Sequence, residues 1–176
     1  MTIARHNPAA SPVLGLILFP VLFLAGCTGD VPQLTHGEPV PTFSLEAVKT
    51  NRPLNFPDAL RGRIVAIRFW ADWCPFCAPE MKALEPVFQR YRERGLAIVA
   101  INVRQGRETA RAFADELGLT YDVLLDREGE VARAYGVMGL PTTFFVDREG
   151  RLRARILGES SGEVFEKIVS KLVTEE

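Results

Sequence analysis

Apolar, β-branched and aromatic residues gather in short runs along the chain, and these runs predict the strands of a sheet. The two strongest cover residues 63–70, which read R-I-V-A-I-R-F-W, and residues 96–103, which read L-A-I-V-A-I-N-V. Weaker runs predict further strands at residues 42–48, 121–125, 142–147 and 151–157, with turns at residues 51–53 and 147–150.

Between these runs, apolar residues recur at three- and four-residue intervals, which predicts helices. The longest covers residues 75–94, where Met81, Leu84, Phe88 and Tyr91 have this spacing. Shorter helices are expected at residues 108–117, 130–135 and 161–173. Strands and helices that alternate and then end in a hairpin and a closing helix predict an α/β fold, with a central mixed β-sheet flanked by helices.

The N-terminal segment has the layout of a secretory signal. A single basic residue, Arg5, precedes an apolar run at residues 12–24, which is interrupted by Pro20. The run is shorter than the about 20 residues that span a bilayer. It ends in L-A-G-C, with the cysteine at Cys27, and this motif resembles the lipobox of bacterial lipoproteins. In that family the chain is cut before the cysteine, whose sulfur then carries a diacylglycerol. An ordinary signal peptide, or an uncleaved anchor in which Cys27 is incidental, is the alternative.

The lipobox resemblance implies three parts: a signal peptide at residues 1–26, a flexible tether at residues 27–41 and a folded domain at residues 42–176. The tether is rich in Gly and Pro and has no periodicity. We therefore expect a protein anchored by the lipid on Cys27 to the extracytoplasmic, periplasmic face of a bacterial membrane. The formal net charge is −1, so the chain lacks the excess of basic residues that is typical of nucleic-acid-binding proteins. No nucleic-acid partner is therefore expected.

Two of the three cysteines, Cys74 and Cys77, stand in the segment W-C-P-F-C. They lie where the strand at residues 63–70 gives way to the longest helix, and α/β sheets place their chemistry at the carboxyl ends of strands. A thiolate at a helix N-terminus is stabilised by unpaired backbone N–H groups and by the helix dipole. The spacing therefore suits thiol–disulfide exchange, in which an exposed Cys74 attacks a substrate disulfide and Cys77 resolves the mixed disulfide.

Other uses of the cysteine pair fit the chain less well or remain open. Haem attachment needs a histidine after the second cysteine, where Ala78 stands. A structural zinc ion needs about four ligands, and the histidines, His6 and His36, lie outside the predicted domain. We expect neither a metal nor a cofactor for the exchange reaction. Two inert core cysteines remain possible, as does a non-enzymatic module that holds Cu(I), in which Cys77→Ser would abolish binding.

Two segments of the chain resemble the signatures of thioredoxin-like proteins. Residues 69–77 read F-W-A-D-W-C-P-F-C and resemble the active-site motif F-W-A-x-W-C-x-x-C. Residues 137–142 read V-M-G-L-P-T and resemble the second signature, V-x-G-x-P-T. The resemblance covers about residues 42–173 and implies a thioredoxin-like fold. A peroxiredoxin has a similar layout, but its P-x-x-x-T-x-x-C segment is not found in this sequence.

Within that superfamily the chain resembles the membrane-anchored reductases of the TlpA/ResA type. The resemblance lies in the lipobox, in the segment G-E-P-V-P-T-F-S-L at residues 37–45, and in an inserted helix–strand at residues 107–125. It implies an N-terminal β extension of the sheet as well as the insertion. Those reductases keep the cysteines of exported targets reduced, notably the haem-binding pair of apocytochrome c. The implied partners are exported proteins with thiols or disulfides and a membrane protein that donates electrons.

The direction of electron flow stays open, because Pro75-Phe76 resembles the dipeptide of glutaredoxins and exported oxidases as much as that of reductases. An oxidase or isomerase of exported proteins is therefore the alternative.

The resemblance also implies roles for single residues. Cys74 would attack, Cys77 would resolve, and Glu80 would tune the thiols or shuttle a proton. Pro141 would be a cis-proline that faces the disulfide, in a loop whose backbone pairs with the substrate. Further contacts with the substrate are expected from Trp73, Pro75, Phe76 and Leu140.

Two features depart from the family pattern. Arg68 stands where thioredoxins have a buried acid and related reductases often have Asn. A cation near Cys74 would favour its thiolate, but the arginine could equally point into solvent. The helix lacks the family's proline at Lys82 and has Pro79 and Pro86 instead, of which Pro86 is expected to bend it.

Overall fold

The structure, a computed structural model, describes Thr2 and residues 32–175. Cys27 and, apart from Thr2, the predicted signal peptide lie outside the described residues. The described part contains a seven-stranded sheet with the order β2-β1-β5-β4-β3-β6-β7. The strands are β1 Phe43–Ala47, β2 Pro53–Phe56, β3 Ile64–Trp70, β4 Leu96–Val103, β5 Asp122–Asp126, β6 Thr142–Val146 and β7 Leu152–Leu157. The helices are α1 Cys77–Tyr91, α2 Arg107–Glu116, α3 Glu130–Ala134 and α4 Gly162–Thr174, with 3-10 turns η1 Asp58–Leu60 and η2 Arg92–Arg94.

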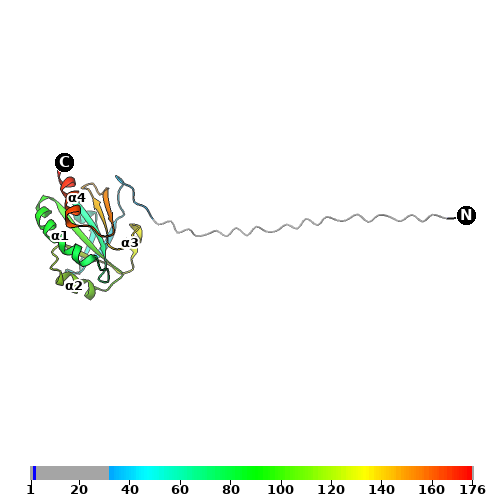
Figure 1. The fold of residues 1–176 in the computed structure, drawn as a ribbon, viewed down its shortest axis with the longest axis horizontal. Helices are drawn as coiled ribbons and strands as arrows, with labels where there is room; N and C mark the ends of the chain where they lie inside the picture. The colour runs from blue at the N-terminus through cyan, green and yellow to red at the C-terminus, as the bar shows by residue number, and fades with distance from the viewer. Residues whose placement is uncertain (1, 3–31, 176) are drawn as a thin grey trace. The chain divides into compact units, whose positions relative to one another are not determined.

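The sheet is mixed, because β3, β4 and β5 are parallel while β1, β2, β6 and β7 pair antiparallel to their neighbours. One face packs against α1, α2 and α4, and the other against α3, η1 and the segment that precedes β1 (Figure 1). The predicted α/β fold with a mixed sheet flanked by helices is confirmed.

The central strands β3 and β4 are buried on both faces, which matches their continuous apolar sequences. β4 has the bounds that the sequence predicts, and β3 begins one residue later. Along β3, Ile64, Ala66 and Trp70 face the core under α1. Val65, Ile67 and Phe69 face the core on the α3 side. This alternation turns the side chain of Arg68 toward α1 as well.

Two local predictions need correction. Pro53 opens strand β2 instead of ending a turn, which an edge strand tolerates because Pro has no N–H to give to a neighbour. The longest helix begins at Cys77, two residues later than predicted, and its regular part ends at Tyr91. Pro86 lies inside α1, and the expected bend there stays a prediction.

The C-terminal end of the predicted tether is part of the folded domain. The N–H of Gly37 donates to the carbonyl of Leu152 (2.7 Å), and the side chain of Val40 is buried. The hydroxyl of Tyr135 donates to the carbonyl of Pro41 (2.7 Å). Backbone hydrogen bonds to the β7 hairpin hold this segment against the domain, and the Gly and Pro content of the segment does not reveal them. The folded part therefore includes residues 37–41, which precede the predicted start of the domain at residue 42.

We expect Tyr135→Phe to loosen this docked segment. Burial raises the pKa of the Tyr135 phenol, so the hydroxyl stays protonated and donates to the Pro41 carbonyl. Its loss should lower the free energy of unfolding by about 1 kcal/mol and speed amide hydrogen exchange at residues 37–41. Urea unfolding and exchange mass spectrometry would measure both.

Tyr121→Phe is the matched control, because that hydroxyl donates to the carbonyl of Met81 inside α1. It should cost similar stability without changing exchange at residues 37–41. Equal exchange there in both variants would contradict the assignment.

Candidate active site

The cysteine pair forms a disulfide at the junction of β3 and α1. Cys77 is the first residue of α1, and Cys74 lies in the loop between strand and helix. The N–H of Cys77 donates to the carbonyl of Cys74 (3.1 Å), which closes a tight turn around the disulfide. No side chain caps the N-terminus of α1, so helix N–H groups next to the sulfur atoms are free of side-chain acceptors.

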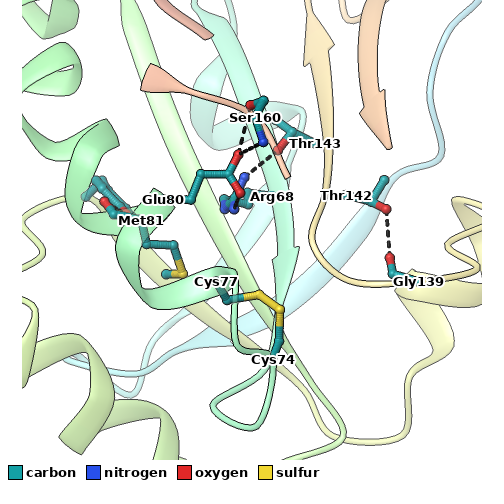
Figure 2. Close-up of polar contacts among 10 residues, drawn as sticks. Arg68, Cys74, Cys77, Glu80, Met81, Gly139, Thr142, Thr143 and Ser160 are labelled. Atoms are coloured by element: carbon teal, nitrogen blue, oxygen red, sulfur yellow. Dashed lines mark hydrogen bonds and ion pairs between the residues drawn. A yellow bond between two sulfur atoms is a disulfide. The ribbon is translucent and has the colours of Figure 1, made fainter. Parts of the chain in front are cut away.

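The second signature lies next to this junction. Thr142, the first residue of β6, pairs with Phe69 near the end of β3, so the preceding loop lies beside the start of the cysteine loop. The Leu140–Pro141 peptide bond is cis, which confirms the cis conformation expected for this proline. The hydroxyl of Thr142 donates to the carbonyl of Gly139 (2.8 Å) and closes the loop on itself (Figure 2).

Cys74 is buried in the disulfide form, with 2 % of its surface exposed, and Cys77 has 0 %. The expectation that Cys74 is exposed is therefore wrong for this state. The reason is that both cysteines belong to the core cluster under α1, together with Trp70 and Met81. The exposed surface belongs to their neighbours.

Those neighbours form an apolar rim around the disulfide. Trp73 is 69 % exposed and Phe76 is 49 % exposed, and Pro75 between the cysteines is exposed as well. Leu140 is half-buried and Pro141 is buried. Met138 is not among the residues expected from the sequence, although it lies three residues before Pro141. Its side chain is 81 % exposed in the same loop as the cis-proline.

Arg68 is buried and points toward α1, which excludes the alternative that it points into solvent. Its side chain is 1 % exposed, and its Nη2 donates to Glu80 Oε2 (2.6 Å). Its Nη1 donates to Thr143 Oγ1 (2.9 Å), because Thr143 stands opposite Arg68 in the β3–β6 ladder. Figure 2 shows Glu80 turned toward both Arg68 and Ser160.

Glu80 is held by three donors. Besides Arg68 at Oε2, the backbone N–H and the hydroxyl of Ser160 donate to Oε1 (2.9 and 2.8 Å). Glu80 stands three residues after Cys77 on α1, so the two residues occupy neighbouring positions on one helix face. Both carboxylate oxygens therefore accept hydrogen bonds from within the chain, and these bonds tie α1 to β3 and to the loop before α4.

Tyr121 lies close to the same group. Burial raises the pKa of its phenol, and the nearby Arg68 cation acts in the opposite direction. The phenol therefore stays neutral and donates to the carbonyl of Met81, next to Glu80 on α1 (3.0 Å).

A second polar group fixes the loop that carries Trp73. The backbone N–H of Asp72 donates to Gln105 Oε1 (2.9 Å), and Gln105 Nε2 donates back to the carboxylate of Asp72. Asn102 on β4 also donates to Gln105 Oε1 (2.8 Å). The first turn of the cysteine loop is thereby tied to the end of β4.

The sequence did not identify the anchors Thr143, Ser160 and Gln105. Thr143 directly follows the P-T of the second signature, but its pairing with Arg68 depends on the strand register. Ser160 lies 80 residues from Glu80, and no local pattern connects the two.

Within Thr2 and residues 32–175, no group of three or more His, Cys, Asp and Glu side chains is placed to hold a metal ion. A helix long and apolar enough to cross a membrane is also absent from this part of the chain.

Comparison with known proteins assigns the family. A model of the AhpC/TSA family matches residues 36–155. The chain belongs to the AhpC/TSA family. Its thioredoxin-like fold is confirmed by the crystal structure of a thiol:disulfide interchange protein, a thioredoxin family protein, from Chlorobium tepidum. The two chains are 28% identical in sequence and superpose with a TM-score of 0.71. The match covers 79% of this chain and 98% of the other.

Two known proteins are similar to this chain in sequence. The thiol-disulfide oxidoreductase ResA of Geobacillus thermodenitrificans is 37% identical over 103 residues, which are 58% of this chain and 59% of the relative. The chain thus matches less than two thirds of that relative's length. The thioredoxin-like protein YneN of Bacillus subtilis is 36% identical over 120 residues, 66% of this chain and 68% of the relative.

Breaking the buried ion pair from one side should be costly. In Arg68→Met the charge of Glu80 is left in the core without its partner, so we expect the free energy of unfolding to fall by about 3–5 kcal/mol. The double variant Arg68→Met/Glu80→Leu should recover most of that loss, because neither charge remains. Urea unfolding of the wild-type protein and of each variant, with the Cys74–Cys77 disulfide intact, would measure these changes.

The exposed pair Arg61–Asp58 provides the control. Arg61→Met should change stability by less than about 1 kcal/mol. An Arg68→Met loss no larger than this control would contradict the buried-pair argument.

Proposed function

We propose that the protein is an exported, lipid-anchored thiol–disulfide oxidoreductase that reduces disulfides of extracytoplasmic proteins. The observation that carries the proposal is the Cys74–Cys77 disulfide at the N-terminus of α1, beside the cis-proline loop. The AhpC/TSA family and the similarity to a ResA named as a thiol-disulfide oxidoreductase support the same chemistry. The lipobox-like motif at Cys27 supports export and anchoring.

The reaction transfers two electrons from the dithiol to the substrate disulfide. The Cys74 thiolate attacks one substrate sulfur, so that a Cys74–substrate bond forms and the second substrate sulfur leaves as a thiolate. The Cys77 thiolate then attacks the Cys74 sulfur, which releases the first substrate sulfur and closes the Cys74–Cys77 disulfide. The two protons of the enzyme dithiol end on the two substrate thiols. A dithiol donor must reduce the Cys74–Cys77 disulfide before the next turnover.

The position of each cysteine favours this order. Cys74 lies in the loop, between the exposed residues Trp73 and Pro75, whereas Cys77 is fully buried at the first helical position. A thiolate at Cys74 lies next to the uncapped N-terminus of α1, where N–H groups and the helix dipole stabilise negative charge. We assign attack to Cys74 and resolution to Cys77.

The rim around the disulfide suits a polypeptide substrate. Trp73, Pro75, Phe76, Leu140 and Pro141 are the proposed contacts. Exposed aromatic side chains are frequent at the centre of protein interfaces because they bury large area at low entropic cost. Exported proteins with a disulfide, such as apocytochrome c before haem attachment, are the proposed substrates, and a membrane dithiol protein is the proposed donor.

Glu80 and Arg68 act, in this proposal, as a fixed electrostatic background for Cys77. Glu80 is held by Arg68 and by Ser160, one helical turn from Cys77. The division of the chain follows the same proposal: residues 1–26 are removed, Cys27 carries the lipid, and a short linker joins it to the domain that starts by Gly37.

Substitution of the cysteines tests the chemistry. Cys74→Ala should abolish reduction of a small disulfide, because the attacking sulfur is gone. Cys77→Ser should stop after the first step and accumulate a mixed disulfide, visible as an added mass that dithiothreitol removes. Full activity of Cys74→Ala would exclude the mechanism.

The reduction potential of the Cys74–Cys77 couple tests the direction. A value near or below about −250 mV supports a reductant, whereas a value near about −120 mV makes the protein an oxidant of exported proteins. The equilibrium with glutathione or dithiothreitol, read by alkylation and mass spectrometry, gives this value.

Substitution of Cys27 tests the anchor. Cells that express the full chain should incorporate labelled palmitate into the protein, and the protein should sediment with membranes. Cys27→Ser should lose both properties, since no thioether can form. Cys77→Ser should keep both, which makes it the matched control, and label retained in Cys27→Ser would exclude lipidation at this cysteine.

A further inference from the structure

A groove of about 430 Å³ begins beside the disulfide. Trp73 of the cysteine loop lines it, as do Gly139 and Leu140 of the cis-proline loop. It continues along the end of β4 to α3, where Ala132 contributes to its wall. A substrate chain joined to Cys74 must pass this rim, so the groove is placed to hold residues next to the attacked cysteine.

The walls of the groove near the disulfide are apolar and exposed. Trp73 and Met138 are 69 % and 81 % exposed, and Val137 is half-buried. Exposed apolar groups that lie together mark binding surfaces. A methionine adapts its shape to different partners, and a tryptophan offers a rigid anchor. These walls fit an apolar side chain of a substrate.

The far end of the groove is cationic. Its charged side chains are Arg104 and Arg133, and no carboxylate lines it. Arg133 donates to the carbonyl of Glu128 (2.8 Å), a contact that leaves its charge uncompensated. Among the residues that the structure describes, no Asp or Glu lies within ion-pair distance of Arg104 or Arg133.

The backbone of Arg104 has an unusual conformation, and its exposed side chain lies against a glycine. Its φ is +57°, in the left-handed region that non-glycine residues rarely adopt. Its N–H donates to the carbonyl of Asp126 (2.9 Å). Its side chain crosses Gly129, where an added Cβ would come within 2.8 Å of Arg104 Nε. The turn after β4 therefore fixes the backbone from which this cation extends.

The two sides of the groove are also linked to each other. Gln105 follows Arg104 and exchanges two hydrogen bonds with Asp72, the residue before Trp73. The apolar wall and the cationic end thus form one unit next to the disulfide.

We propose that Arg104 and Arg133 form a subsite for an acidic side chain of the substrate protein, next to its target cysteine. The occupant is an extended segment that places an apolar side chain between Trp73 and Met138 and a carboxylate at the two arginines. Charge complementarity selects this occupant over a neutral or basic one. The inference rests on the proposed thiol–disulfide exchange and names the class of substrate sequence that it favours.

Peptide disulfides test the subsite. The substrates are short peptides, each with one intramolecular disulfide and a neighbouring Leu. In each peptide one position within four residues of either cysteine carries Glu, Gln or Lys, and every such position is tested in turn. The pre-reduced protein is mixed with each peptide, the reaction is stopped by alkylation, and mass spectrometry gives the second-order rate constant. At one or more positions Glu should react about three- to tenfold faster than Gln, and Lys more slowly than Gln. The preference should shrink as salt is raised.

Variants assign the preference to the two arginines. Arg104→Gln/Arg133→Gln should reduce the Glu-to-Gln ratio toward one, and Arg104→Lys should keep most of it. Arg127→Gln removes a nearby exposed arginine outside the groove and should leave the ratio unchanged. Equal rates for Glu, Gln and Lys at every position would overturn the subsite, as would a ratio that survives in the double variant or falls equally in Arg127→Gln.

The failure of the two proposals is distinguishable. If the wild-type protein reduces the Gln peptide but shows no charge preference, the subsite alone is wrong. If it reduces none of the peptides, the exchange function itself is wrong.

Discussion

The buried ion pair between Arg68 and Glu80 is the constraint around which the site is built. β3 is buried on both faces, so an arginine in its middle needs a charge partner inside the domain. Glu80 of α1 supplies it, Ser160 from the loop before α4 holds the other carboxylate oxygen, and Thr143 of β6 holds the guanidinium. The consecutive elements β3 and α1 are joined here to two segments far away in sequence, β6 and the loop before α4, and Cys77 lies one helical turn away.

Stability alone does not account for this pair. Apolar side chains of similar volume at the two positions would stabilise the core as well, because two buried charges lose their hydration before they attract each other. The pair instead fixes geometry: a guanidinium and a carboxylate with four hydrogen bonds between them and their partners accept few orientations. The face of α1 that carries Cys77 is thereby held against β3, at the end where the cysteine loop leaves the strand.

The sequence predicts the fold well because its signals are local. The apolar run at residues 96–103 gives β4 to the residue, and the two signatures place the disulfide and the cis-proline. The remaining features depend on contacts between distant segments. Strand alternation gives the direction of Arg68, but its ion pair requires Glu80 on the facing helix. The docking of residues 37–41 requires the β7 hairpin, and the burial of Cys74 requires the core beneath α1.

The burial of the disulfide links recognition to chemistry. Because Cys74 exposes 2 % of its surface while Trp73 beside it exposes 69 %, a partner meets the rim before it meets the sulfur. A small thiol gains little from that rim, whereas a polypeptide that fits it is held next to the reactive bond, which raises the effective concentration of its own sulfur. Arg68 is neutralised within the chain, but Arg104 and Arg133 meet no carboxylate among the described residues and face the groove. The buried pair of Arg68 and Glu80 orients α1. Arg104 and Arg133 act, in the proposed function, on the polypeptide that binds at the rim.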